Sequence, residues 1–181
     1  ACDPFTLDAA RRMLGDVIHT PTPIAATPWR DMPALFARLG DGSAADCLRW
    51  CMLTLVRVNA ARGARQGEIE GGIWTVPADR VKGAEGRAQA FRVPLPAAAQ
   101  EIAQRAAQFD ADLLFPGATG RAPITDRALE LHLDRLGEAG RPHGFRSAFR
   151  SWVQDTDACT WEVAETILGH AIGNRVERSY A

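Results

Sequence analysis

The chain has 181 residues, of which 46% are hydrophobic and 24% are charged. This length fits one domain with at most a short appendage, and the apolar content supports a packed core, which excludes an intrinsically disordered chain. The formal net charge of −1 argues against a DNA-binding role based on overall charge, although a basic face balanced by acids elsewhere is compatible with this total.

Membrane and secreted classes are also excluded by the sequence pattern. No apolar run approaches the length of a membrane-spanning helix, and the first residues lack the apolar stretch of a signal peptide. Cys47 and Cys51 are one helical turn apart between apolar neighbours, and no CxxC pair is present. We therefore expect reduced core thiols, no bound metal and a cytoplasmic protein.

The first third of the chain reads as a linker followed by helices. Residues 1–28 combine a short helical stretch with an extended segment rich in proline and threonine. Residues 31–40 form an amphipathic pattern that ends at Gly40. Residues 41–57 predict a longer buried helix, with Ser43 and Asp46 at the spacing of a capping box and Arg57 at its C-terminal end. A short helical stretch at residues 59–66 follows.

The middle of the chain changes character. Residues 68–77, "EIEGGIWTVP", read as two short strands around a Gly-Gly turn. A second turn carries Lys82 near its tip, and a third strand follows at residues 90–95. Helical patterns resume at residues 96–109, 125–137, 144–155, 160–170 and 174–181. The fold class is therefore predicted to be mainly α with a small three-stranded antiparallel β-sheet.

Four polar residues could take part in catalysis or binding, but each has an ordinary structural alternative. His143 and Arg146 are three residues apart on the first helical turn, where backbone donors favour an anion; a solvated arginine-rich face fits equally. His170 follows a helix end, where it is a ligand or only a C-terminal cap. Arg57 follows the apolar run "CMLTLV", where a charge is costly unless it is paired in a salt bridge or used in a site.

Two residue types occur only once. Lys82 is the single lysine beside twenty arginines, and Tyr180 is the single tyrosine, next to the last residue. A preference for arginine codons explains the imbalance between arginine and lysine. Under that preference a retained lysine is informative, because lysine gives up a proton far more readily than arginine.

Taken in order, these residues resemble the tyrosine recombinase (phage integrase) family, in particular its P4-like prophage integrase branch. The phrases that carry the resemblance are "LTLVR", "GIWTVPADRVKG", "FRVPL", "LLFPG", "RPHGFRSAFRSW" and "EVAETILGHAIGNRVERSY". The resemblance runs from about Trp29 to the end of the chain. It implies a tyrosine recombinase catalytic domain at residues 29–181, with residues 1–28 as a linker or the end of a preceding core-binding segment.

The resemblance also implies a mechanism of DNA cleavage without a metal or other cofactor. Tyr180 is then the nucleophile, and Lys82 is the acid that protonates the leaving 5′ oxygen. The non-bridging phosphate oxygens are bound by Arg57, Arg146 and His170, and His143 serves as base or phosphate donor. The implied partners are double-stranded DNA at attachment sites and further integrase subunits, as a tetramer in the active complex, with no membrane partner.

One position departs from the family pattern and keeps alternatives open. The family usually has an acid three residues after the first arginine, whereas this chain has Ala60. A degenerate integrase that binds DNA without cutting is therefore one alternative. A type IB topoisomerase-like enzyme that nicks and reseals DNA shares the same residues and is another. A generic helical interaction domain leaves the six aligned polar residues unexplained.

Overall fold

The computed structural model describes residues 25–81, 89–108 and 112–170. Its helices are α2 (Met32–Arg38), α3 (Ser43–Thr54), α4 (Val58–Arg62), α5 (Ala97–Ala106), α6 (Asp126–Arg135), α7 (Gly144–Thr156) and α8 (Trp161–Ile167). The strands β1 (Ile69–Glu70), β2 (Ile73–Val76) and β3 (Phe91–Pro94) form one antiparallel sheet in the order β1-β2-β3. The predicted fold class is confirmed. None of the helices in these ranges is long and apolar enough to cross a bilayer.

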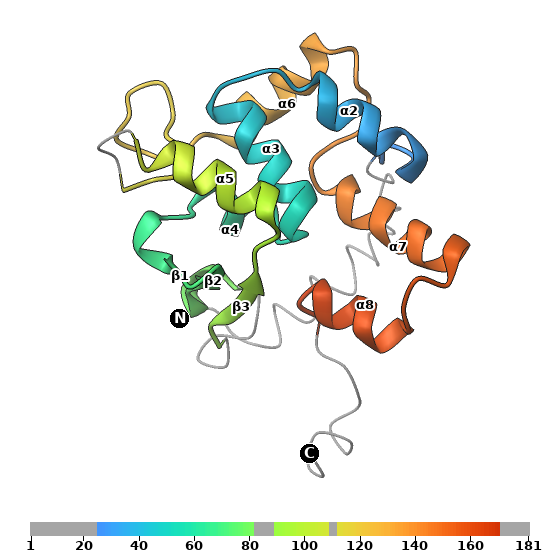
Figure 1. The fold of residues 1–181 in the computed structure, drawn as a ribbon. Helices are drawn as coiled ribbons and strands as arrows, with labels where there is room; N and C mark the ends of the chain where they lie inside the picture. Colours follow the sequence, from blue (N-terminus) through green and yellow to red (C-terminus); the bar gives the residue numbers. More distant parts are fainter. Residues whose placement is uncertain (1–24, 82–88, 109–111, 171–181) are drawn as a thin grey trace, which may run out of the picture.

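Helix α3 is the centre of the core, with α5, α6 and α7 around it (Figure 1). The helix predicted to be buried does bury one face, which includes Cys47, Trp50 and Cys51. The Trp50 ring meets Trp74 of β2 edge-on at 5.3 Å between ring centroids and Phe115 at 5.7 Å. These aromatic contacts join the helical layer to the sheet, because Trp74 is also fully buried.

The predicted capping box at the start of α3 is wrong. Gly42 is the N-cap, and no side chain caps this helix end. The Ser43 hydroxyl instead donates to the Pro116 carbonyl at 2.7 Å. Asp46 accepts a hydrogen bond from Arg105 at 2.8 Å. Both side chains that were predicted to cap the helix therefore form hydrogen bonds with residues distant in sequence instead.

The sheet follows the predicted hairpin. Gly71 and Gly72 have φ of 54° and 76°, the left-handed values that a two-residue hairpin turn requires and glycine adopts readily. Where β2 ends, Arg80 pairs with Glu68, whose carboxylate also accepts the Trp74 indole N–H at 3.0 Å. This partly buried network fixes the chain beyond β2, before Lys82, which lies outside the described residues.

Residues 25–28 pack beside the start of α7. The Arg141 N–H donates to the Ala25 carbonyl at 3.0 Å. Gly144 is required at this crossing, because a Cβ there would lie 2.7 Å from the Ala26 Cα. Residues 25–28 are therefore in contact with the helical layer, and the domain boundary at residue 28 remains a prediction.

Candidate active site

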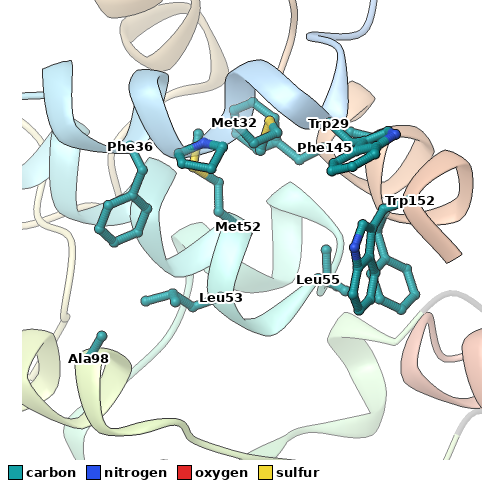
Figure 2. Close-up of a pocket in the computed structure, with 12 residues that line it drawn as sticks. Trp29, Met32, Phe36, Met52, Leu53, Leu55, Ala98, Phe145 and Trp152 are labelled. Carbon is teal, nitrogen blue, oxygen red and sulfur yellow. The ribbon is translucent and has the colours of Figure 1, made fainter. Parts of the chain in front are cut away.

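One hollow of the described structure is apolar. It has a volume of about 680 Å³ and lies among α2, α3, α5 and α7 (Figure 2). Its walls include Trp29, Phe36, Met52 and Trp152, and no ionisable side chain lines it. This groove offers no group for acid–base or phosphate chemistry, so the candidate active site must be sought elsewhere.

A smaller polar pocket of about 70 Å³ collects the predicted residues. Four of the six, from three separate parts of the sequence, line it together with Ser147, Arg150 and Leu168: Arg57, His143, Arg146 and His170. The remaining two, Lys82 and Tyr180, lie outside the described residues. The structure thus brings together every predicted site residue that it describes.

Arg57 enters this pocket from a sharp change of chain direction. Helix α3 ends at Thr54, and Leu55 takes a left-handed conformation with φ of 54°. This conformation costs a residue with a Cβ roughly 1–2 kcal/mol. Arg57 then becomes the N-cap of α4 rather than the end of α3. This change of direction places the Arg57 side chain in the pocket beside α7.

Within the described ranges, no carboxylate forms an ion pair with Arg57. The salt-bridge alternative for this residue is therefore not observed there. Ala60, at the family's acidic position, is 2% exposed, and its carbonyl accepts from Arg80 at 3.3 Å. Arg57 also lines an adjoining hollow of about 410 Å³ with Asp79, Val81 and His143.

Arg146 lies at the base of the pocket and is 7% exposed. Its guanidinium donates to the Leu55 carbonyl, to the Leu168 carbonyl at 2.7 Å and to His170 Nε2 at 2.9 Å. Among the described residues these acceptors engage three of its five N–H groups, and two are not used by these contacts. The strained turn at Leu55 therefore supplies a carbonyl that holds the arginine.

Burial lowers the pKa of Arg146 to about 10, with additional repulsion from the charges of Arg57 and Arg150. Glu165 opposes this effect. The guanidinium remains cationic at neutral pH, because even the lowered pKa lies well above 7. Three arginines thus direct positive charge into one small volume, an arrangement suited to a phosphate.

Arg146→Ala is expected to destabilise the protein by about 2 kcal/mol, because the Leu55 and Leu168 carbonyls lose a buried donor. Relief of repulsion from Arg57 and Arg150 offsets part of this cost. For a chain of this size the melting temperature should fall by roughly 4–8 °C. Thermal unfolding by circular dichroism measures the shift. Arg127→Ala, at an exposed ion pair on α6, is the matched control and should change little; equal shifts would contradict the role of Arg146.

His170 is placed by the end of α8. The His170 N–H donates to the Glu165 carbonyl at 2.9 Å and the Gly169 N–H to Thr166 at 2.9 Å. Gly169 has φ of 61°, so these bonds form a Schellman motif. The backbone of His170 is therefore a helix cap, as one sequence alternative held, while its ring lines the pocket.

Two residues that the sequence analysis did not identify complete this region. Arg150 donates from Nε at 3.0 Å and from Nη2 at 2.6 Å to Oε1 of Glu165, and from Nη2 at 2.8 Å to Oε2. Glu165 Oε2 lies 2.6 Å from His170 Nδ1. The sequence carries only a weak signal for them: Arg146 and Arg150 are four residues apart on one helix, so two like charges share a face that a nearby carboxylate would stabilise.

The carboxyl of Glu165 is 6% exposed. Burial on its own raises its pKa, but hydrogen bonds from His170 and Arg150 and the charge of Arg150 outweigh burial, so the pKa lies below its ordinary value. A carboxyl with a lowered folded-state pKa contributes stability above its unfolded pKa of about 4.3 and loses it as the pH falls through the folded value.

We therefore expect part of the acid destabilisation below about pH 4.3 to depend on Glu165. Glu165→Gln cannot ionise, so its free energy of unfolding should be lower than that of the wild type at pH 7, and the difference should shrink as the pH falls. Urea unfolding at a series of pH values measures it. A difference that stays constant across this range would contradict the assignment.

The start of α7 does not offer the backbone donors that the sequence predicted. The N–H groups of Gly144, Phe145 and Arg146 donate to the carbonyls of Arg141, Pro142 and His143, respectively. The first turn is thus closed on itself, and an anion in the pocket must be bound by side chains. The expectation of a helix N-terminal anion site is wrong for this reason.

Comparison with solved structures identifies the fold. The Tn1549 transposon integrase in complex with circular intermediate DNA aligns with a TM-score of 0.65 and 12% identity over 91% of this chain and 66% of that chain. A lambda integrase tetramer bound to a Holliday junction aligns with a TM-score of 0.65 and 12% identity, over 90% of this chain and 52% of that chain. XerH site-specific recombinase bound to a palindromic difH substrate aligns with a TM-score of 0.56 and 17% identity, over 88% of this chain and 50% of that chain.

The chain therefore has the catalytic-domain fold of tyrosine recombinases, and it spans 50–66% of the length of these three structures. At identities of 12–17% this likeness concerns the fold. No protein-family model and no curated protein sequence matches the chain.

Proposed function

We propose that this chain is the catalytic domain of a site-specific DNA recombinase that integrates or excises a mobile element, of the P4-like prophage integrase type. The observation that carries the proposal is the convergence of Arg57, His143, Arg146 and His170 on one small pocket. The fold supports it, because the structures that share the fold are integrases and a recombinase in complex with DNA.

In the proposed reaction the Tyr180 phenol oxygen attacks the scissile phosphorus. The bond from phosphorus to the 5′ oxygen breaks, leaving a 3′-phosphotyrosyl bond and a free 5′ hydroxyl. His143 takes the phenol proton, and Lys82 gives a proton to the departing oxygen. Arg57, Arg146 and His170 stabilise charge on the non-bridging oxygens. A 5′ hydroxyl from another strand reverses the attack, so strands exchange without a cofactor.

The proposed partners are double-stranded DNA at attachment sites and further copies of the recombinase. Lambda integrase forms a tetramer on a Holliday junction, and we propose four subunits in the active complex here too. The basic groups of the pocket face DNA in this assembly. Since phosphate contacts release counterions, DNA binding should weaken as salt rises.

The test is a covalent adduct on a nicked suicide substrate, a duplex whose cleaved fragment diffuses away and prevents religation. The chain should form a species that survives a denaturing gel and disappears after protease treatment. Peptide mass spectrometry should place the DNA on Tyr180, the only tyrosine. Adduct on any other residue would refute the proposed chemistry.

Two kinds of substrate separate the alternatives: the suicide substrate reports cleavage, and intact duplexes report resealing or strand exchange. A DNA-binding protein without cleavage is favoured by one observation, the lack of a carboxylate paired with Arg57 in the described ranges, and it predicts a gel shift with no adduct. A topoisomerase-like enzyme predicts that a supercoiled duplex is nicked and resealed, and so relaxed, without products in which two duplexes have exchanged strands. The recombinase predicts products with strands exchanged between two duplexes that carry the site.

A further inference from the structure

We propose that Glu165, held in place by Arg150, is a positioning residue that fixes the ring orientation and protonation pattern of His170. This inference rests on the proposed function for its catalytic consequence, but its structural part is independent of any reaction. Neither residue appears in the set of six expected from the sequence.

The hydrogen bonds around His170 define one tautomer. Arg146 Nη2 lies 2.9 Å from Nε2 of the ring. A guanidinium has no acceptor, so Nε2 must present its lone pair. A neutral imidazole then carries its proton on Nδ1, which faces Glu165 Oε2 at 2.6 Å. The carboxylate thus holds the proton on Nδ1.

Arg150 acts on the carboxylate rather than on the ring. Its Nη2 also lies 3.0 Å from His170 Nδ1, but a protonated Nδ1 cannot accept from it. The three contacts from Arg150 to the two oxygens of Glu165 are hydrogen bonds to a charged acceptor, and they fix the carboxylate plane. Arg150 itself is half-exposed, whereas Glu165 is buried.

A buried carboxylate is costly, and a well-packed apolar residue often serves stability as well as a buried ion pair. Glu162, one turn earlier on α8, is exposed and already supplies an acid in the first turn of the helix. Glu165 is therefore not needed for that role. The retained charge at Glu165 has a chemical use if His170 becomes a donor. Donation from Nε2 to a phosphate oxygen requires a second proton, taken from solvent, and the carboxylate stabilises the resulting imidazolium.

The structural test uses the protein without DNA. Nitrogen-15 NMR of the ring nitrogens distinguishes protonated from unprotonated Nδ1 and Nε2. His170 should show a protonated Nδ1 and an unprotonated Nε2 in the wild type. His132 is an internal reference of the opposite kind, because its Nε2 lies 2.8 Å from the Leu39 carbonyl, which only accepts.

Glu165→Met has a similar length but no carboxylate. It should weaken the Nδ1 preference of His170 while leaving His132 unchanged, because Arg150 Nη2, 3.0 Å from Nδ1, can then donate to that nitrogen in competition with Arg146 at Nε2. Glu162→Met is the matched control on the same helix and should alter neither ring. A wild-type His170 protonated at Nε2 alone, or a Glu165→Met protein with an unchanged His170 pattern, would overturn the proposal. Thermal unfolding of each variant verifies that it is folded.

The functional test compares adduct formation at saturating DNA with DNA affinity. Glu165→Met should slow adduct formation by roughly 10–100-fold, by analogy with the loss of a carboxylate that orients a metal-ligating histidine. Its affinity for DNA should remain close to that of the wild type. In a His170→Ala background the same change should cost nothing further, because Glu165 acts through His170. An equal additional loss in both backgrounds would overturn the proposal.

The two tests fail separately. If the wild type forms no adduct, the proposed function fails, and the NMR result still decides whether Glu165 positions His170. If the wild type forms the adduct but the NMR pattern of His170 does not depend on Glu165, only the positioning proposal fails.

Discussion

Tyr180→Phe is expected to abolish the covalent protein–DNA adduct while leaving DNA binding nearly unchanged. The substitution keeps the aromatic ring and removes only the oxygen that attacks phosphorus. Since no other tyrosine is present, the reaction cannot move to a second phenol. Denaturing gels measure the adduct, and a gel shift or fluorescence anisotropy measures binding at the same salt concentration.

Ser179→Ala is the matched control, because it removes the neighbouring hydroxyl. It should form adduct as the wild type does. Adduct formation by Tyr180→Phe would assign the nucleophile to another residue. Loss of both adduct and DNA affinity would indicate that the Tyr180 hydroxyl maintains structure or contacts DNA, and the loss of adduct would then not identify the nucleophile.

The fold could be predicted from sequence where local pattern and tertiary packing agree. The buried stripe of α3 and the Gly71-Gly72 hairpin follow from periodicity and from the backbone freedom of glycine. The capping box failed because Ser43 and Asp46 have better partners elsewhere in the fold. Local spacing carries no information about such long-range partners.

The candidate site also contains residues that the sequence predicts and residues that only the structure reveals. Arg57, His143, Arg146 and His170 were found as a set because their order resembled a family, and the structure places them in one pocket. Arg150 and Glu165 escaped notice, since an arginine and a glutamate on two helices look like ordinary surface residues. Only the packing of α7 against the end of α8 reveals that Glu165 is buried against His170.

The left-handed turn at Leu55 could not be predicted at all. Leucine rarely adopts positive φ, so the residue type at position 55 gives no indication of a turn. The turn is supported from outside by Arg146, which donates to the Leu55 carbonyl. A long-range contact across 91 positions therefore shapes the segment that presents Arg57.

Lys82→Ala is expected to slow DNA cleavage by roughly 10²–10⁴-fold, the usual contribution of a general acid. The reason is specific to the leaving group. An alkoxide at the 5′ position leaves poorly unless it receives a proton as the bond to phosphorus breaks. Single-turnover adduct formation on the suicide substrate measures the rate.

A second substrate isolates this role. Sulfur in place of the bridging 5′ oxygen leaves as a thiolate, which needs little protonation. Lys82→Ala should therefore recover most of its lost rate on the sulfur substrate. Arg146→Ala is the control that should not recover, since its proposed contacts are with the non-bridging oxygens, and Tyr180→Phe should remain inactive on both substrates.

The comparison of substrates also separates catalysis from binding. If Lys82 only contacted the DNA backbone, its loss would slow the cleavage of both substrates equally, because the bridging atom does not change the charge of the duplex. Equal defects of Lys82→Ala on the two substrates would thus remove Lys82 as the acid. The proton donor would then have to come from another group beside the pocket, and His143, which lines it together with Arg57, would be the next residue to test with the same sulfur substrate.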